Sequence, residues 1–134
     1  MHRPWLTAGF VAAALGVVAL TFGPSPADLL FTLTQSVPGL DELSSTTVEM
    51  AANVLLFVPV ALLLAAAAPR LSGVLVWLLC TAASAGVEAA QLVLPGRQTS
   101  VRDVVLNSAG AAIGVLLHAL VGRRRSRSPG RARR

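Results

Sequence analysis

Residues 50–68 read MAANVLLFVPVALLLAAAA, a stretch with one polar side chain, Asn53, and no charged residue. A bilayer core about 30 Å thick is crossed by about 20 mostly apolar residues in an α-helix. A helix also satisfies its own backbone hydrogen bonds where water is absent. The stretch therefore predicts a membrane-spanning helix that ends at Pro69-Arg70. Pro59 inside it is tolerated in a membrane and predicts a kink.

Three further apolar runs of this length flank the first, and Gly or Pro follows each of them. They are Trp5–Phe22, Gly73–Leu94 and Val104–Val121. No run shows the alternation of a strand. The predicted fold class is all-α, an integral membrane protein with a bundle of four transmembrane helices. Two details remain open: Trp5–Phe22 has an alternative interpretation as a cleaved signal peptide, and Ala27–Val37 is expected to form a short interfacial helix outside the membrane.

The composition excludes most other classes of protein. Of the 134 residues, 54% are apolar and 13% are charged, and the mean hydropathy is +0.71. An average soluble domain carries about 25% charged residues, and a domain this small has too little interior to hide so many apolar side chains. A soluble globular enzyme is therefore excluded, and so is disorder over most of the chain.

The formal net charge of +5 belongs to one end of the chain. Residues 122–134 contain seven arginines and no acid, whereas residues 1–121 contain four arginines and six acids, a balance of −2. Beside a membrane such a tail predicts contact with anionic lipids. Nucleic acid is not an expected partner, because the tail has no aromatic residue to stack on bases. Cys80 is the sole cysteine, so no intrachain disulfide can form.

Charge also predicts the orientation. Arg3, Arg70 and the tail fall on one side of a four-span bundle, while the loop Gly23–Glu49 on the other side carries four acids and no cation. The positive-inside rule therefore places both termini in the cytoplasm. We divide the chain into residues 1–48 (first transmembrane helix and external loop), 49–121 (a three-helix membrane region) and 122–134 (a basic disordered cytoplasmic tail).

Polar side chains inside the spans are costly and mark functional or structural sites. Ser84, Glu88 and Gln91 lie at i, i+4 and i+7, on one face of one helix, and Asp103 and Asn107 share a face of the next. By helix rise, these groups fall in the outer half of the bilayer. The sequence therefore predicts one external polar cluster with these members: Asn53, Glu88, Gln91, Arg97, Asp103 and Asn107.

The predicted cluster has two interpretations. In the functional one, Arg97 or Arg102 pairs with Glu88 and keeps donors free for an anionic headgroup. In the structural one, polar groups only join the helices, each for about 1 kcal/mol or less. Helix packing is the preferred role for Pro59, Ser84, Gly110, Gly114 and His118. No catalytic constellation, metal-ligand set or phosphate-binding loop is apparent, so no cofactor or metal is expected.

Over residues 49–121 the sequence resembles the VanZ-like family of membrane proteins. The resemblance rests on these residues: NVLLFVP (Asn53–Pro59), Ser84-x-x-x-Glu88-x-x-Gln91, Arg97, and Asp103–Asn107 followed by Gly110 and Gly114. Ala61 departs from the pattern, since the family usually has glycine soon after the proline. The resemblance implies a multi-pass protein of the bacterial cytoplasmic (plasma) membrane, in a family named after a protein associated with resistance to teicoplanin. It brings no catalytic residues.

Three functions follow as hypotheses. The preferred one is an envelope-associated binding or accessory module, in which the predicted cluster recognises a lipid-linked or amphiphilic envelope molecule at the outer leaflet. The second is an intramembrane enzyme acting on an envelope lipid, with Glu88 or Asp103 as general base. The third is a subunit of a small transporter, which requires a homo-oligomer because four spans form a thin pathway.

Overall fold

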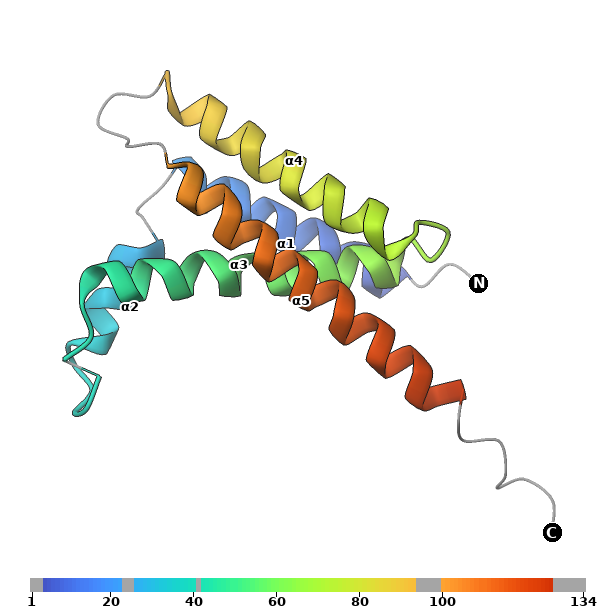
Figure 1. The fold of residues 1–134 in the computed structure, drawn as a ribbon, viewed down its shortest axis with the longest axis horizontal. Helices are drawn as coiled ribbons and strands as arrows, with labels where there is room; N and C mark the ends of the chain where they lie inside the picture. Colours follow the sequence, from blue (N-terminus) through green and yellow to red (C-terminus); the bar gives the residue numbers. More distant parts are fainter. Residues whose placement is uncertain (1–3, 23–25, 41, 94–99, 127–134) are drawn as a thin grey trace, which may run out of the picture.

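The computed structural model describes residues 4–22, 26–40, 42–93 and 100–126, without the side chains of residues 17–22, 26–29 and 124–126. This part of the chain is helical and contains no strand (Figure 1). The helices are α1 (Pro4–Phe22), α2 (Pro26–Thr34), α3 (Ser45–Ala67), α4 (Gly73–Gln91) and α5 (Val101–Ser126). The predicted all-α class is confirmed.

Three helices are long and apolar enough to cross a membrane, judged by length and composition. They are α3, α4 and the Val101–Arg123 part of α5. Helix α1 coincides with the first predicted span, but Pro4–Gly16, its apolar part among the described side chains, is shorter than a span. The protein is thus a helical membrane protein with three clear spans, and the fourth crossing stays a prediction.

The helix ends follow local capping chemistry. Ser44 Oγ accepts a hydrogen bond from the Thr47 N–H at 3.2 Å, and Ser72 Oγ accepts one from the Leu75 N–H at 3.1 Å. These are N-caps, which satisfy backbone donors that the first helical turn leaves unpaired. The cap at Ser44 explains why α3 begins at Ser45, before the predicted start at Met50.

The last two spans also differ from their predicted bounds. Helix α4 ends at Gln91, not Leu94. Helix α5 begins at Val101 and continues to Ser126, so the first part of the basic tail is helical where disorder was expected. Arginine is a good helix former, and extending an existing helix costs far less than starting one. The short helix expected at Ala27–Val37 is present as α2.

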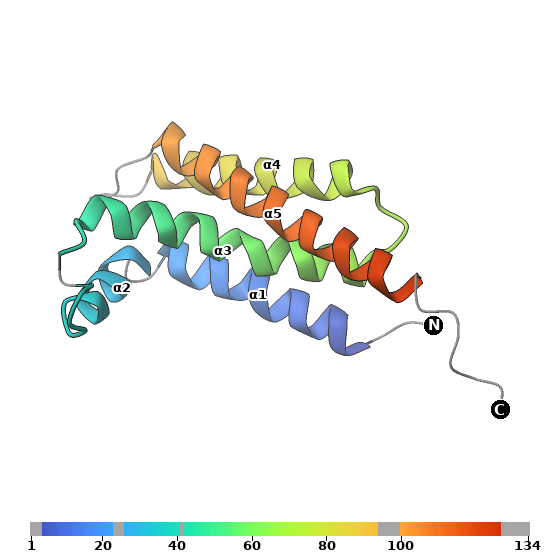
Figure 2. The same ribbon diagram turned by 60° about the horizontal axis from the view of Figure 1, so that its bottom comes forward.

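Helix α3 lies at the centre of the bundle. It contacts α1, α2, α4 and α5, and its most extensive contact is with α5. In Figure 2, α1 lies on one side of α3, with α4 and α5 on the other. Helices α3 and α5 begin at the same end of the bundle, which is also the end where α4 finishes. The chain therefore brings the polar parts of α3, α4 and α5 to one end.

Glycine allows α3 and α5 to approach closely. A Cβ atom on Gly110 would collide with the Val54 carbonyl oxygen, and one on Gly114 would collide with that of Val58. The two contacts lie one turn apart on both helices, so the backbones stay close over at least one turn. This is the small-xxx-small packing common between membrane helices.

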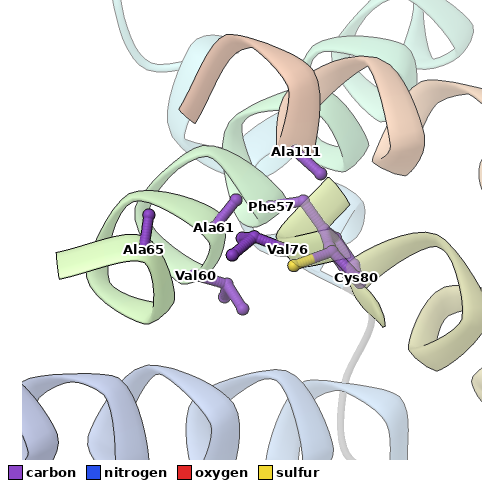
Figure 3. Close-up of a cluster of buried hydrophobic side chains, with 7 residues drawn as sticks. All are labelled: Phe57, Val60, Ala61, Ala65, Val76, Cys80 and Ala111. Atoms are coloured by element: carbon purple, nitrogen blue, oxygen red, sulfur yellow. The ribbon is translucent and has the colours of Figure 1, made fainter. Parts of the chain in front are cut away.

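The buried apolar core is small and consists mostly of short side chains. Figure 3 shows its members: Phe57, Val60, Ala61, Ala65, Val76, Cys80 and Ala111. Cys80 lies among them with 3% of its surface exposed, as a small apolar side chain. Larger side chains point outward, including Leu55 (63% exposed) and Leu116 (61%). An apolar exterior around a core of small residues suits a bundle surrounded by lipid.

Candidate functional site

A row of hydrogen bonds joins α4 to α5. Asn107 Nδ2 donates to Ser84 Oγ at 2.8 Å, and both residues are buried. Further along, Thr81 Oγ1 and Ser108 Oγ lie 2.9 Å apart, and Trp77 Nε1 donates to the Ser108 carbonyl oxygen at 3.1 Å. These bonds fix the rotation of α4 against α5, so that the polar face of α4 meets α5.

Sequence reasoning missed Trp77, Thr81 and Ser108 in this row. The signal was present, because Trp77, Thr81, Ser84 and Glu88 are spaced i, i+4, i+7 and i+11, one continuous face of a helix. Thr81 and Trp77 were not recognised because threonine and tryptophan are common in spans. The polar face of α4 therefore extends from Trp77 to Glu88, beyond the residues Ser84, Glu88 and Gln91 that the sequence spacing had indicated.

Five polar side chains meet at the end of the bundle where α3 and α5 begin and α4 finishes. We call them the interhelical site: Glu49, Asn53, Glu88, Asp103 and Asn107. The charges of Glu49 and Glu88 act on the Asp103 carboxylate, and the Asn53 side chain lies close enough to interact with it as a weak hydrogen-bond donor. Four of the five were predicted as cluster members, and Glu49 was missed because it was assigned to the loop before α3.

Glu88 does not pair with an arginine among the described residues. Its Oε2 atom accepts a hydrogen bond from the backbone N–H of Ser100 at 2.9 Å. Ser100 directly precedes α5, so a carboxylate from α4 caps the start of α5. A carboxylate at a helix N-terminus is stabilised by the unpaired N–H groups and by the helix dipole. Of the two expected pairs, Arg102–Glu88 is wrong, because Arg102 pairs with Glu49, and the alternative pair with Arg97 lies outside the described residues.

Arg102 binds a different carboxylate. Its Nη2 atom lies 3.0 Å from Glu49 Oε2, and its Nε atom lies 3.8 Å from Asp103 Oδ1. The Arg102 and Glu49 side chains are 45% and 41% exposed, whereas that of Asp103 is 17% exposed. This ion pair thus stands at the rim of the interhelical site and links α3 to α5. Exposed pairs of this kind contribute about 0–1 kcal/mol each.

Three polar atoms in the interhelical site are buried without a hydrogen-bond partner. They are Asn53 Nδ2, Asp103 Oδ1 and Asn107 Oδ1. Most buried polar atoms in proteins have a partner, and each exception calls for an explanation. Asn53 Nδ2 on α3 and Asp103 Oδ1 on α5 lie close to each other but form no hydrogen bond of standard geometry, and Asn107 Oδ1 lies one turn further along α5.

The remaining predicted residues lie elsewhere. Gln91 is half-buried at the last residue of α4, and Arg97 lies outside the described residues. Pro59 is exposed within α3, which continues through it as one helix; the kink stays a prediction. His118 is half-buried and lies about 22 Å from Asp103 by helix rise, so it belongs to the other end. No group of three His, Cys, Asp or Glu residues suited to a metal ion occurs in the described part.

Comparison with known proteins identifies the family. A model of the VanZ/LLP1 family matches residues 10–122. The chain belongs to the VanZ/LLP1 family. The match starts within α1, contains α2, α3 and α4 and ends within α5, so it extends beyond the residues 49–121 on which the resemblance was based. No curated protein and no solved structure matches this VanZ/LLP1 family member.

Proposed function

We propose that this VanZ/LLP1 family member is an envelope-associated binding or accessory module. Its interhelical site would take the polar headgroup of a lipid-linked or amphiphilic envelope molecule. We place the site at the outer leaflet of the bacterial plasma membrane, on the basis of the arginine distribution. A role in resistance to glycopeptide antibiotics of the teicoplanin type belongs to the proposal, and the family resemblance is its basis.

The observation that carries the proposal is the set of unpaired atoms: Asn53 Nδ2, Asp103 Oδ1 and Asn107 Oδ1. An unsatisfied buried polar group costs about 1–3 kcal/mol. A ligand that pairs all three atoms removes this cost, and the gain contributes to its affinity. If these residues served only to join helices, their hydrogen bonds would be made within the bundle, as Ser84 and the Nδ2 atom of Asn107 do.

The exposure of the site supports access from the membrane surface. Glu49 and Arg102 are half-exposed at its rim, Asp103 is mostly buried, and Asn107 is the deepest member with 7% of its surface exposed. The exposed fraction of the side chains therefore falls from the rim of the site to Asn107. A headgroup would enter from the rim while its acyl chain remains in the surrounding lipid.

Asp103→Asn is the sharpest test, because it removes a charge but keeps the shape of a side chain whose Oδ1 atom makes no hydrogen bond and only a 3.8 Å ion pair with Arg102. Glu42→Gln is the matched control, since Glu42 is an exposed acid outside the site. A strain lacking the protein would be complemented with each variant and tested for glycopeptide susceptibility. We expect Glu42→Gln to restore the wild-type level and Asp103→Asn to fail.

Expression in the membrane must be equal for both variants. Full complementation by Asp103→Asn, and also by Asn107→Leu, would show that the interhelical site is not the working site. A strain whose susceptibility does not change when the protein is deleted would remove the link to glycopeptide resistance.

A further inference from the structure

The interhelical site carries surplus negative charge. Glu49, Glu88 and Asp103 supply three carboxylates, and Arg102, the one described cation beside them, lies 3.0 Å from Glu49 Oε2 and 3.8 Å from Asp103 Oδ1. The described groups therefore sum to −2, or to −1 if Arg97 in the neighbouring loop is counted. An anionic headgroup would add like charge to this site, whereas a cation would relieve it.

The fold leaves Asp103 available to a ligand. The sequence Ser100-Val101-Arg102-Asp103 has the form of a capping box, in which the acid at the third helical position accepts from the N–H of the residue before the helix. Here the Ser100 N–H donates to Glu88 Oε2 instead. Glu88 takes over the capping role, and Asp103 Oδ1 remains buried without a hydrogen-bond partner.

Asn107 supplies a second acceptor, four residues after Asp103 on α5. The residue is 7% exposed, its Nδ2 atom is bound to Ser84, and its Oδ1 atom has no partner. Side chains on a helix lean towards the helix N-terminus. Asn107 therefore leans towards Asp103, one turn earlier on α5. On α3, Asn53 leans towards Glu49 in the same way, and its Nδ2 atom is an unpaired donor.

The unpaired atoms define the group that fits them. Two acceptors in a site of negative charge are best satisfied by a cation that carries N–H donors. The nearby donor on Asn53 is best satisfied by an oxygen atom close to that cation. A water molecule would satisfy the hydrogen bonds but not the charge. A quaternary ammonium would satisfy the charge but has no N–H to donate.

We infer that the interhelical site binds a primary ammonium group with an oxygen close to it, as in an ethanolamine phosphate or an amino sugar. This inference rests on the proposed function and specifies the headgroup. The ammonium donates to Asp103 Oδ1 and Asn107 Oδ1, and Asn53 Nδ2 donates to the neighbouring oxygen. The same group occurs on a lipid headgroup and on a small free molecule, and the experiment below separates these two sources.

The test compares lipids that differ only in the headgroup. Purified full-length protein in detergent is titrated with phosphatidylethanolamine, phosphatidylcholine and phosphatidylglycerol of identical acyl chains, and bound lipid is counted by native mass spectrometry. We expect phosphatidylethanolamine to bind at least about tenfold more tightly than phosphatidylcholine, since hydrogen bonds to charged groups are the stronger kind. Free phosphoethanolamine, titrated separately, competes only if the acyl chains are dispensable.

Two variants assign the preference to the site. Asp103→Asn should abolish most of the tenfold difference, and the control Glu42→Gln should keep it. Asn53→Lys gives the site an ammonium of its own, so it should also lose the preference while its helical circular dichroism and thermal midpoint stay at or above those of the wild type. This second variant separates loss of binding from loss of folding.

The outcomes distinguish this inference from the proposed function. The ammonium assignment is overturned if phosphatidylethanolamine and phosphatidylcholine bind equally, or if phosphatidylglycerol binds more tightly in a manner that depends on Asp103. Either result leaves a headgroup site in place. If no headgroup is bound in a manner that depends on Asp103 or Asn53, both the assignment and the proposed binding function fail.

Discussion

Replacing Gly110 with alanine should destabilise the bundle through one methyl group. The added Cβ would collide with the Val54 carbonyl oxygen and lie 3.0 Å from its carbonyl carbon. Ordinary contact begins at 3.4 Å, and the carbonyl oxygen is closer still than the carbon, so α5 must move away from α3 by clearly more than 0.4 Å at this point. The atoms it meets belong to the backbone of α3, so no side-chain rotation can relieve the contact.

The expected loss follows from two opposing terms. Overpacking costs about 1–3 kcal/mol, and we take the upper half of that range because backbone must move. Alanine in place of a helical glycine stabilises the folded protein by about 0.5–1 kcal/mol, because the unfolded chain then has less conformational entropy to lose on folding. The free energy of unfolding should therefore fall by about 1–2.5 kcal/mol. It is measured by titrating the protein with sodium dodecyl sulfate in mixed micelles and following its helical circular dichroism.

Gly86→Ala provides the matched control. Gly86 lies inside α4, and a Cβ there would meet nothing within 4 Å, so only the favourable term remains. We expect this variant to be as stable as the wild type or more stable. The close α3–α5 contact would be refuted if Gly110→Ala behaved like Gly86→Ala, or if both substitutions destabilised the protein equally.

Three further predictions concern the helix ends, the polar row between α4 and α5, and the orientation. In a double-mutant cycle of Ser84→Ala and Asn107→Ala, the same titration should give a coupling energy of about 0.6–1.7 kcal/mol, the range found between membrane helices, and zero coupling would contradict the buried hydrogen bond. Ser72→Ala should lower the free energy of unfolding by about 1 kcal/mol through loss of the α4 cap. Ser72→Asp should keep most of the stability that the cap provides, because aspartate is also a good N-cap residue. A membrane-impermeant maleimide applied to intact cells should label Glu42→Cys but not Arg70→Cys in a cysteine-free background, and the reverse pattern would invert the proposed orientation.

Sequence patterns anticipated most of the polar site because helix periodicity assigns residues to faces. The spacing of Ser84, Glu88 and Gln91 placed them on one face of α4, and that of Asp103 and Asn107 placed them on one face of α5. Three members of the interhelical site (Glu88, Asp103 and Asn107) followed from this rule, and Asn53 followed from being the one polar side chain in its apolar run. Glu49 did not, since the cap at Ser44 starts α3 earlier than hydropathy suggests and brings Glu49 into the helix.

The pairing of the charges could not be predicted in the same way. Glu88 was expected to bind an arginine, because a buried carboxylate requires donors and Arg97 and Arg102 were the cations in reach. Among the described residues, the fold instead brings the Ser100 N–H to Glu88 and pairs Arg102 with Glu49, while Arg97 lies outside them. Backbone donors at a helix start are equally suitable partners, but a sequence does not reveal which side chain will reach them.

By itself, the sequence determined the helical membrane architecture, because the length of an apolar run and the bilayer thickness are both local quantities. It also determined which residues share a helix face. Only the tertiary structure decided that α3 and α5 pack backbone to backbone at Gly110 and Gly114, and which polar atoms of the interhelical site are left unpaired. Those properties depend on how the helices rotate and cross, and that is settled by contacts between residues far apart in the chain.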